Sequence, residues 1–145
     1  MTSAAEVYGA LSAKTARRLR LLARICLGFL TVFIGVVSLI PGPAVAQIDP
    51  FDLNDKIAHF IAYGVVGLVL PWAVTLRPQV AAGLAALTAY SGLVEILQAM
   101  LSERSGEWLD LAANGAGLGA GTLVSLGFAW LILAAIRTRS RVHSD

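Results

Sequence analysis

Four long stretches of mostly apolar residues fill the chain, and short polar segments separate them. The stretches are residues 21–40, 57–76, 80–101 and 111–136. Each holds the roughly 20 residues that an α-helix needs to cross about 30 Å of hydrocarbon. The stretches are continuously hydrophobic, with glycine and alanine interspersed, and they lack the period-two alternation of transmembrane β-strands. The pattern predicts an all-α polytopic membrane protein, built as a four-helix transmembrane bundle.

Composition agrees with this pattern and leaves no room for a soluble domain. Hydrophobic residues make up 57% of the chain and charged residues 14%, and the mean hydropathy is +0.76. A soluble domain carries far more charge. We therefore expect a basic N-terminal segment over residues 1–20, a transmembrane domain over 21–136 and a basic tail over 137–145.

The basic residues predict how the helices are oriented. Nine of the eleven lysines and arginines lie before the first helix, between the second and third, or after the fourth. Only Lys56 and Arg104 lie on the other side. The positive-inside rule therefore predicts cytoplasmic termini and external segments at 41–56 and 102–110. The basic residues flank membrane spans instead of forming a stripe with aromatics, so we expect no nucleic-acid partner.

The first apolar stretch has a second interpretation. A basic region, an apolar core and the Ala44-Val45-Ala46 sequence also describe a cleavable signal peptide ending at residue 46. The length of the apolar run and of the segment before it favours a retained helix. Both interpretations predict the same orientation for the three later helices.

Polar residues recur within the apolar helices at helical spacing. Asp55, His59 and Tyr63 are four residues apart and share one face of the second helix. On the third helix a polar stripe consists of Thr88, Ser91, Glu95, Gln98 and Ser102. On the fourth helix polar residues give way to small ones, in the order Asp110, Asn114, Gly117 and Gly121, with a second G-x-x-x-G at Gly115 and Gly119. We expect the glycines to let helices approach closely.

Depth brings these stripes to one level. Glu95 lies six residues from Leu101, which places it about 9 Å from the outer end of the third helix. His59 and Asn114 lie a turn or so inside helices that run the other way. The three faces should form a polar bowl that opens outward, with Lys56, Arg104 and Asp110 at its rim. A purely structural hydrogen-bond network, at about 0.6 kcal/mol per contact, is the competing interpretation, and it is favoured for Gln98, Ser91 and Thr88.

Two local features make further structural predictions. Pro71 should bend the second helix and free a backbone carbonyl that a neighbouring helix can satisfy. The short turn at residues 76–79 should force the second and third helices into an antiparallel hairpin whose members pack directly together.

The order of these residues resembles the VanZ-like membrane proteins. The resemblance covers residues 54 to 121, and it rests on Asp55-Lys56-x-x-His59-Phe60, Glu95-x-x-Gln98, Arg104, Asp110 and Asn114, with glycines following. It implies a small multi-helix protein of the bacterial inner membrane. Some members of the family are associated with reduced susceptibility to the glycopeptide teicoplanin, and others lie near envelope polysaccharide pathways.

The first functional hypothesis is recognition of an anionic lipid-linked precursor or phospholipid headgroup at the outer leaflet. Lys56, Arg104 and two outward-facing helix N-termini can stabilise phosphate. The expected binding residues are Asp55, Lys56, His59, Tyr63, Glu95, Gln98, Arg104, Asp110 and Asn114. Besides lipids, the expected partners are another membrane protein or a second copy of the chain.

Two other hypotheses stay open. Glu95 and His59 could exchange a proton with a lipid-linked substrate, which would make the protein an acid–base enzyme. No nucleophile elbow, zincin motif or P-loop is present, and no recognised metal-ligand spacing, so we favour a non-enzymatic role and expect no cofactor or metal. The small-residue face of the fourth helix also suits a scaffold subunit of envelope polysaccharide assembly.

Overall fold

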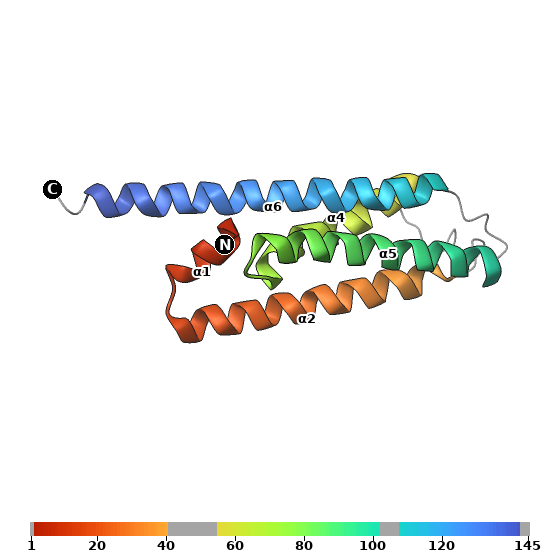
Figure 1. Cartoon of the computed structure of the whole chain (residues 1–145), viewed down its shortest axis with the longest axis horizontal. Helices are drawn as coiled ribbons and strands as arrows, with labels where there is room; N and C mark the ends of the chain where they lie inside the picture. The colour runs from red at the N-terminus through yellow and green to blue at the C-terminus, as the bar shows by residue number, and fades with distance from the viewer. Residues whose placement is uncertain (1, 41–54, 102–107, 143–145) are drawn as a thin grey trace.

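A computed structural model describes residues 2–40, 55–101 and 108–142 (Figure 1). These residues form only helices: α1 (Ser3–Gly9), α2 (Ala13–Ser38), α4 (Asp55–Ala73), α5 (Arg77–Leu101) and α6 (Trp108–Val142). Four of them are long and apolar enough to cross a membrane. The predicted all-α fold with four transmembrane helices is confirmed.

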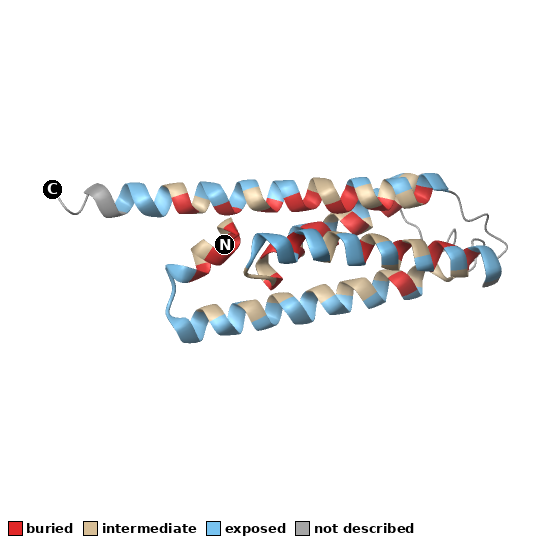
Figure 2. Ribbon diagram, viewed as in Figure 1, coloured by how far each residue is buried: buried red, intermediate tan, exposed pale blue. Residues whose placement is uncertain are grey.

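The long helices lie side by side along the long axis of the molecule (Figure 1). Helices α4 and α6 begin, and α5 ends, at one end of the bundle, which we call the Asp55 end. Large apolar side chains such as Phe29, Leu123 and Trp130 are exposed on the outside of the bundle, and the buried positions face inward (Figure 2). This arrangement suits a protein whose surrounding solvent is lipid.

All four long helices begin before the predicted apolar spans, and α2 and α6 extend furthest beyond them. Helix α2 begins at Ala13, eight residues before the predicted start, where the Ser12 hydroxyl accepts a hydrogen bond of 3.2 Å from the Thr15 amide. Helix α6 continues past residue 136 to Val142. Lysine and arginine are good helix formers, so a helix need not stop where its hydrophobic stretch stops.

Helix α1 was not predicted, because its seven residues are too short and too polar to show a hydrophobic period. The Thr2 hydroxyl caps it by accepting from the Ala5 amide at 3.0 Å, and the Thr2 amide donates to the Thr75 carbonyl at 3.1 Å. Tyr8 packs edge-on against Trp72 and lies under the Arg20 guanidinium, 5.3 Å from the ring centre. Burial raises the pKa of the Tyr8 phenol, although Arg20 opposes the rise, so the ring is neutral at pH 7 and the contact is a cation–π interaction.

Glycines bring α4 and α6 into backbone contact. A Cβ added at Gly117 would lie 3.0 Å from the Gly64 amide nitrogen, and one added at Gly121 would lie 2.9 Å from the Gly64 carbonyl carbon. The expected close approach is therefore confirmed for this G-x-x-x-G pair. A Cβ added at Gly115 or Gly119 would meet no atom of another helix within 4 Å, so the expectation is wrong for the pair Gly115 and Gly119 within this chain.

Pro71 lies inside α4 and leaves the Gly67 carbonyl, four residues earlier, without its helical amide donor. The Thr122 hydroxyl of α6 donates to that carbonyl at 3.2 Å. A neighbouring helix thus satisfies the group that the proline frees, as expected.

Helix α4 packs more extensively against α6 and α2 than against α5. The hairpin partners do meet, where Leu70 of α4 lies against Gly83 of α5. The prediction that the second and third helices pack directly together is therefore only partly right. The short turn at residues 74–76 keeps α4 and α5 adjacent at one end. The backbone contact at the glycines, however, makes α6 the main neighbour of α4.

Candidate functional site

Buried polar side chains from α4, α5 and α6 meet near the Asp55 end of the bundle. His59 and Glu95 are each 8% exposed, Asp110 is 4% exposed and Asn114 is fully buried. Asp55 and Lys56, from the first turn of α4, lie beside them. We call these six residues the polar cluster.

Asn114 links the three helices. Its side-chain nitrogen donates to Glu95 Oε1 at 3.2 Å, and its Oδ1 lies 3.0 Å from His59 Nδ1. Because the amide oxygen can only accept, His59 Nδ1 carries the proton that it donates. Glu95 Oε1 also lies 3.7 Å from His59 Nδ1, so the carboxylate and the Asn114 amide oxygen face the same ring nitrogen.

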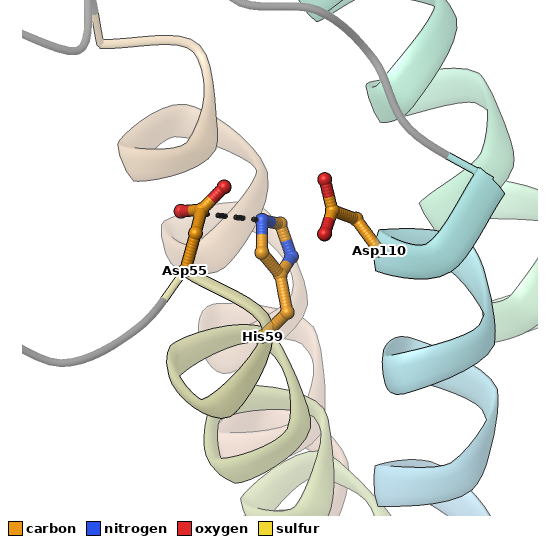
Figure 3. Close-up of side chains that lie close together, drawn as sticks. All are labelled: Asp55, His59 and Asp110. Atoms are coloured by element: carbon orange, nitrogen blue, oxygen red, sulfur yellow. Dashed lines mark ion pairs between the residues drawn. The ribbon is translucent and has the colours of Figure 1, made fainter.

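A second layer of the polar cluster lies closer to the Asp55 end. His59 Nε2 is 4.0 Å from Asp55 Oδ1, one helical turn away on α4. Lys56 Nζ lies 3.7 Å from Asp110 Oδ1, which connects α4 to the first turn of α6. Figure 3 shows the carboxylates of Asp55 and Asp110 on either side of the His59 ring.

The structure thus brings six of the nine predicted binding residues together, and three lie elsewhere or outside the described residues. Tyr63 belongs to the apolar core, deeper along α4 than the polar cluster. Gln98 donates to the Ser38 carbonyl and so joins α5 to the end of α2. Arg104 lies outside the described residues.

The expected open bowl is wrong in one respect. Depth along the helices correctly placed His59, Glu95 and Asn114 at one level, but the side chains are buried. Hydrogen bonds across three helices draw them together, so the cluster is a packed network with its exposed side at Asp55 and Lys56. Asp110, predicted at the rim, lies inside.

Two hollows reach the polar cluster from different sides. A groove of about 470 Å³ between α5 and α6 is apolar along most of its length and includes Glu95. A smaller pocket of about 120 Å³ between α2 and α4 includes His59 and Asp55. The predictions missed the groove residues Ala89, Gly92, Ile96 and Ala99, although their spacing of three and four beside Glu95 was a usable signal.

These features define the class of protein: a polytopic helical membrane protein whose spans share a buried cluster of ionisable side chains. The VanZ/LLP1 family model matches residues 13–133, which covers α2, α4 and α5 and most of α6, and the chain belongs to this family. The resemblance seen in the sequence is confirmed. Comparison with curated proteins and with solved structures gave no match.

Proposed function

We propose that this protein binds an anionic lipid-linked envelope precursor, or a lipid headgroup, at the outer leaflet of the bacterial cytoplasmic membrane. The observation that carries the proposal is the groove between α5 and α6, because it joins an apolar surface to the polar cluster. An amphiphile needs both kinds of surface, side by side.

The apolar part of the groove suits a lipid chain. Leu93 and Ile96 are exposed on α5, and small residues, among them Gly92, keep the space between the helices open. A chain lying here would contact protein instead of other lipids while staying in hydrocarbon. Trp108, exposed at the start of α6, is the kind of residue that is enriched at headgroup depth.

The polar part of the site suits a headgroup that carries both hydroxyls and phosphate. The carboxylates of Asp55, Glu95 and Asp110 can accept hydrogen bonds from sugar hydroxyls. Lys56 and the N-termini of α4 and α6 supply positive charge for a phosphate. Arg104, expected on the same side from the sequence, would add a second cation. A glycosylated lipid phosphate matches this mixture better than a simple anion does.

The orientation of the protein is part of the proposal. Nine basic residues support cytoplasmic termini, which would make the Asp55 end the external one. When the protein binds an envelope precursor, it would change how glycopeptides such as teicoplanin act on the cell. Polysaccharide pathways that use the same lipid carriers would also be affected.

Blocking the groove tests the lipid role. Gly92→Leu places a large side chain in the groove, and a Cβ at this position meets only Leu111 at 3.7 Å, which is ordinary contact. Gly127→Leu is the matched control, because a Cβ added at Gly127 would meet nothing within 4 Å. After gentle extraction, native mass spectrometry should show a lipid adduct of defined mass on the wild type and on Gly127→Leu, and several-fold less of it on Gly92→Leu. Equal adducts on all three proteins would refute the lipid role of the groove.

Acid–base catalysis is the second candidate, and the connection from His59 through Asn114 to Glu95 favours it. Such a connection can hold a base and an acid in fixed orientation. Turnover of a lipid-linked substrate by purified protein would distinguish catalysis from binding.

A further inference from the structure

Three metal-ligating side chains from two helices converge at the Asp55 end of the bundle. Asp55, His59 and Asp110 each offer a donor atom, and these atoms all lie within 4.8 Å of one another (Figure 3). Asp55 and His59 come from consecutive turns of α4, and Asp110 comes from the first turn of α6.

The hydrogen bonds of His59 leave one ring nitrogen suited to a metal. Asn114 donates to Glu95 through its amide nitrogen, so its oxygen faces His59 and accepts the proton on Nδ1. In the neutral imidazole, Nε2 then carries a lone pair, and it faces Asp55 Oδ1 at 4.0 Å. Metal-binding histidines usually donate their other ring N–H to a protein oxygen, which fixes the orientation of the ring.

Asp110 supplies a second, independent observation. The residue is 4% exposed, and its Oδ1 atom is buried without a hydrogen-bond partner among the described residues. Lys56 Nζ lies 3.7 Å from this oxygen, which is an ion-pair distance too long for a hydrogen bond. The Lys56 side chain is 39% exposed, so it can move away from the carboxylate. A buried carboxylate oxygen that lacks a donor is a favourable ligand for a cation.

We propose that Asp55, His59 and Asp110 form a binding site for a divalent cation, with Zn²⁺ or Mn²⁺ as the matching class. Both ions accept imidazole nitrogen together with carboxylate oxygen, whereas Ca²⁺ and Mg²⁺ favour oxygen ligands alone. Ligand atoms of one tetrahedral zinc ion lie about 3.4 Å apart, so the widest pair of donor atoms, now within 4.8 Å, has to close by about 1.4 Å when the ion binds. The sequence did not predict the site, because Asp55 and His59 lie one turn apart on α4 but the third ligand, Asp110, comes from α6 at no motif spacing.

A bound ion would also change the charge of the polar cluster. It would offset the carboxylates and offer open coordination positions to a phosphate oxygen. This consequence rests on the proposed lipid function, whereas the binding of the ion itself does not.

The test measures metal binding without any candidate lipid ligand. Full-length protein without a histidine tag is placed in nanodiscs of phosphatidylcholine, treated with chelator and titrated with Mn²⁺ or Zn²⁺ by calorimetry. The wild type should bind one equivalent. Asp110→Asn and His59→Gln should each weaken binding at least about tenfold. The matched control is His143→Gln, which removes the chain's other histidine and should leave binding unchanged.

A spectroscopic measurement covers the case in which the site variants fail to fold. In the His143→Gln protein, electron paramagnetic resonance of bound Mn²⁺ should show coupling to one imidazole nitrogen, because only His59 remains. The proposal is overturned if the wild type binds no ion, if folded Asp110→Asn and His59→Gln bind it as tightly as the wild type, or if the nitrogen coupling is absent. If Gly92→Leu loses the lipid adduct but still binds the metal, the first result supports the groove and the second supports the metal site, so the two proposals can fail independently.

Discussion

Replacing Gly121 by alanine tests the closest helix contact of the protein. The added Cβ would lie 2.9 Å from the Gly64 carbonyl carbon and 3.0 Å from the Leu68 amide nitrogen. Both atoms belong to the backbone of α4, so no side chain can rotate away and the two helices must separate. Overpacking of this kind costs about 1–3 kcal/mol. The better helix propensity of alanine returns up to about 1 kcal/mol. Because the rigid backbone of α4 puts the overpacking cost in the upper part of its range, about 2–3 kcal/mol, we expect a net loss of about 1–2 kcal/mol.

Gly119→Ala provides the matched control on the same helix. Nothing lies within 4 Å of a Cβ at this position, so only the propensity gain applies and stability should stay level or rise slightly. Separation of the helices in Gly121→Ala should also lengthen the Thr122 to Gly67 hydrogen bond, now 3.2 Å, which adds to the difference between the variants.

The assay is reversible unfolding in mixed micelles with an increasing fraction of sodium dodecyl sulfate, followed by circular dichroism. Gly121→Ala should unfold at a lower fraction than the wild type, and Gly119→Ala at the same or a higher one. Equal loss in both variants, or wild-type stability in Gly121→Ala, would refute the reasoning, because α4 and α6 would then not meet through these glycines.

Further predictions concern the proline carbonyl, the carboxylate of α5 and the orientation of the chain. Thr122→Val should cost about 0.5–1.5 kcal/mol in the same unfolding assay, because the Gly67 carbonyl loses its donor. Adding Pro71→Ala to Thr122→Val should recover part of this loss, because the alanine amide can donate to the Gly67 carbonyl. Equal losses in Thr122→Val and in the double variant would contradict this explanation. Glu95→Gln keeps an oxygen that can accept from Asn114 but cannot ionise, so the protein should accumulate normally in the membrane. The proposed effect on teicoplanin susceptibility in a sensitive strain should be lost in Glu95→Gln and retained in the packing control Ser91→Ala. A full effect in Glu95→Gln at matched abundance would exclude a role for an ionised Glu95. Reporter fusions at the C-terminus should report a cytoplasmic location, and a periplasmic signal would reverse the proposed orientation.

The position of the polar cluster along the helices could be predicted because depth is simple arithmetic. Helix direction alternates in a hairpin topology, and each residue adds a fixed rise, so His59, Glu95 and Asn114 fall at one level without knowledge of packing. Depth alone could not predict whether these three side chains contact one another. Contact depends on how each helix is rotated about its axis, which the packing of whole surfaces decides.

Gln98 shows the limit of grouping residues by spacing. It shares the polar stripe with Glu95, yet it lies a turn closer to the helix end, where the backbone carbonyl of Ser38 is the nearest partner. Tyr63 shares a face with His59 in the same way, and it lies deep enough to join the apolar core. Residues on one face of a helix can thus serve different neighbours at different depths.

The sequence by itself determined the number of membrane spans and the helical class, because hydrophobicity summed over about 20 residues is a local property that needs no partner. The family followed from the order and spacing of the polar residues along the chain. Only the tertiary structure decided which helices meet. Gly115 with Gly119 and Gly117 with Gly121 form the same G-x-x-x-G motif. Only the pair Gly117 and Gly121 contacts α4. Two residues rotate an α-helix by about 200°, so the two pairs face nearly opposite directions. The rotation that α6 adopts, held by backbone contact with α4 and by the hydrogen bonds of Asn114, determines which pair is buried and which faces lipid.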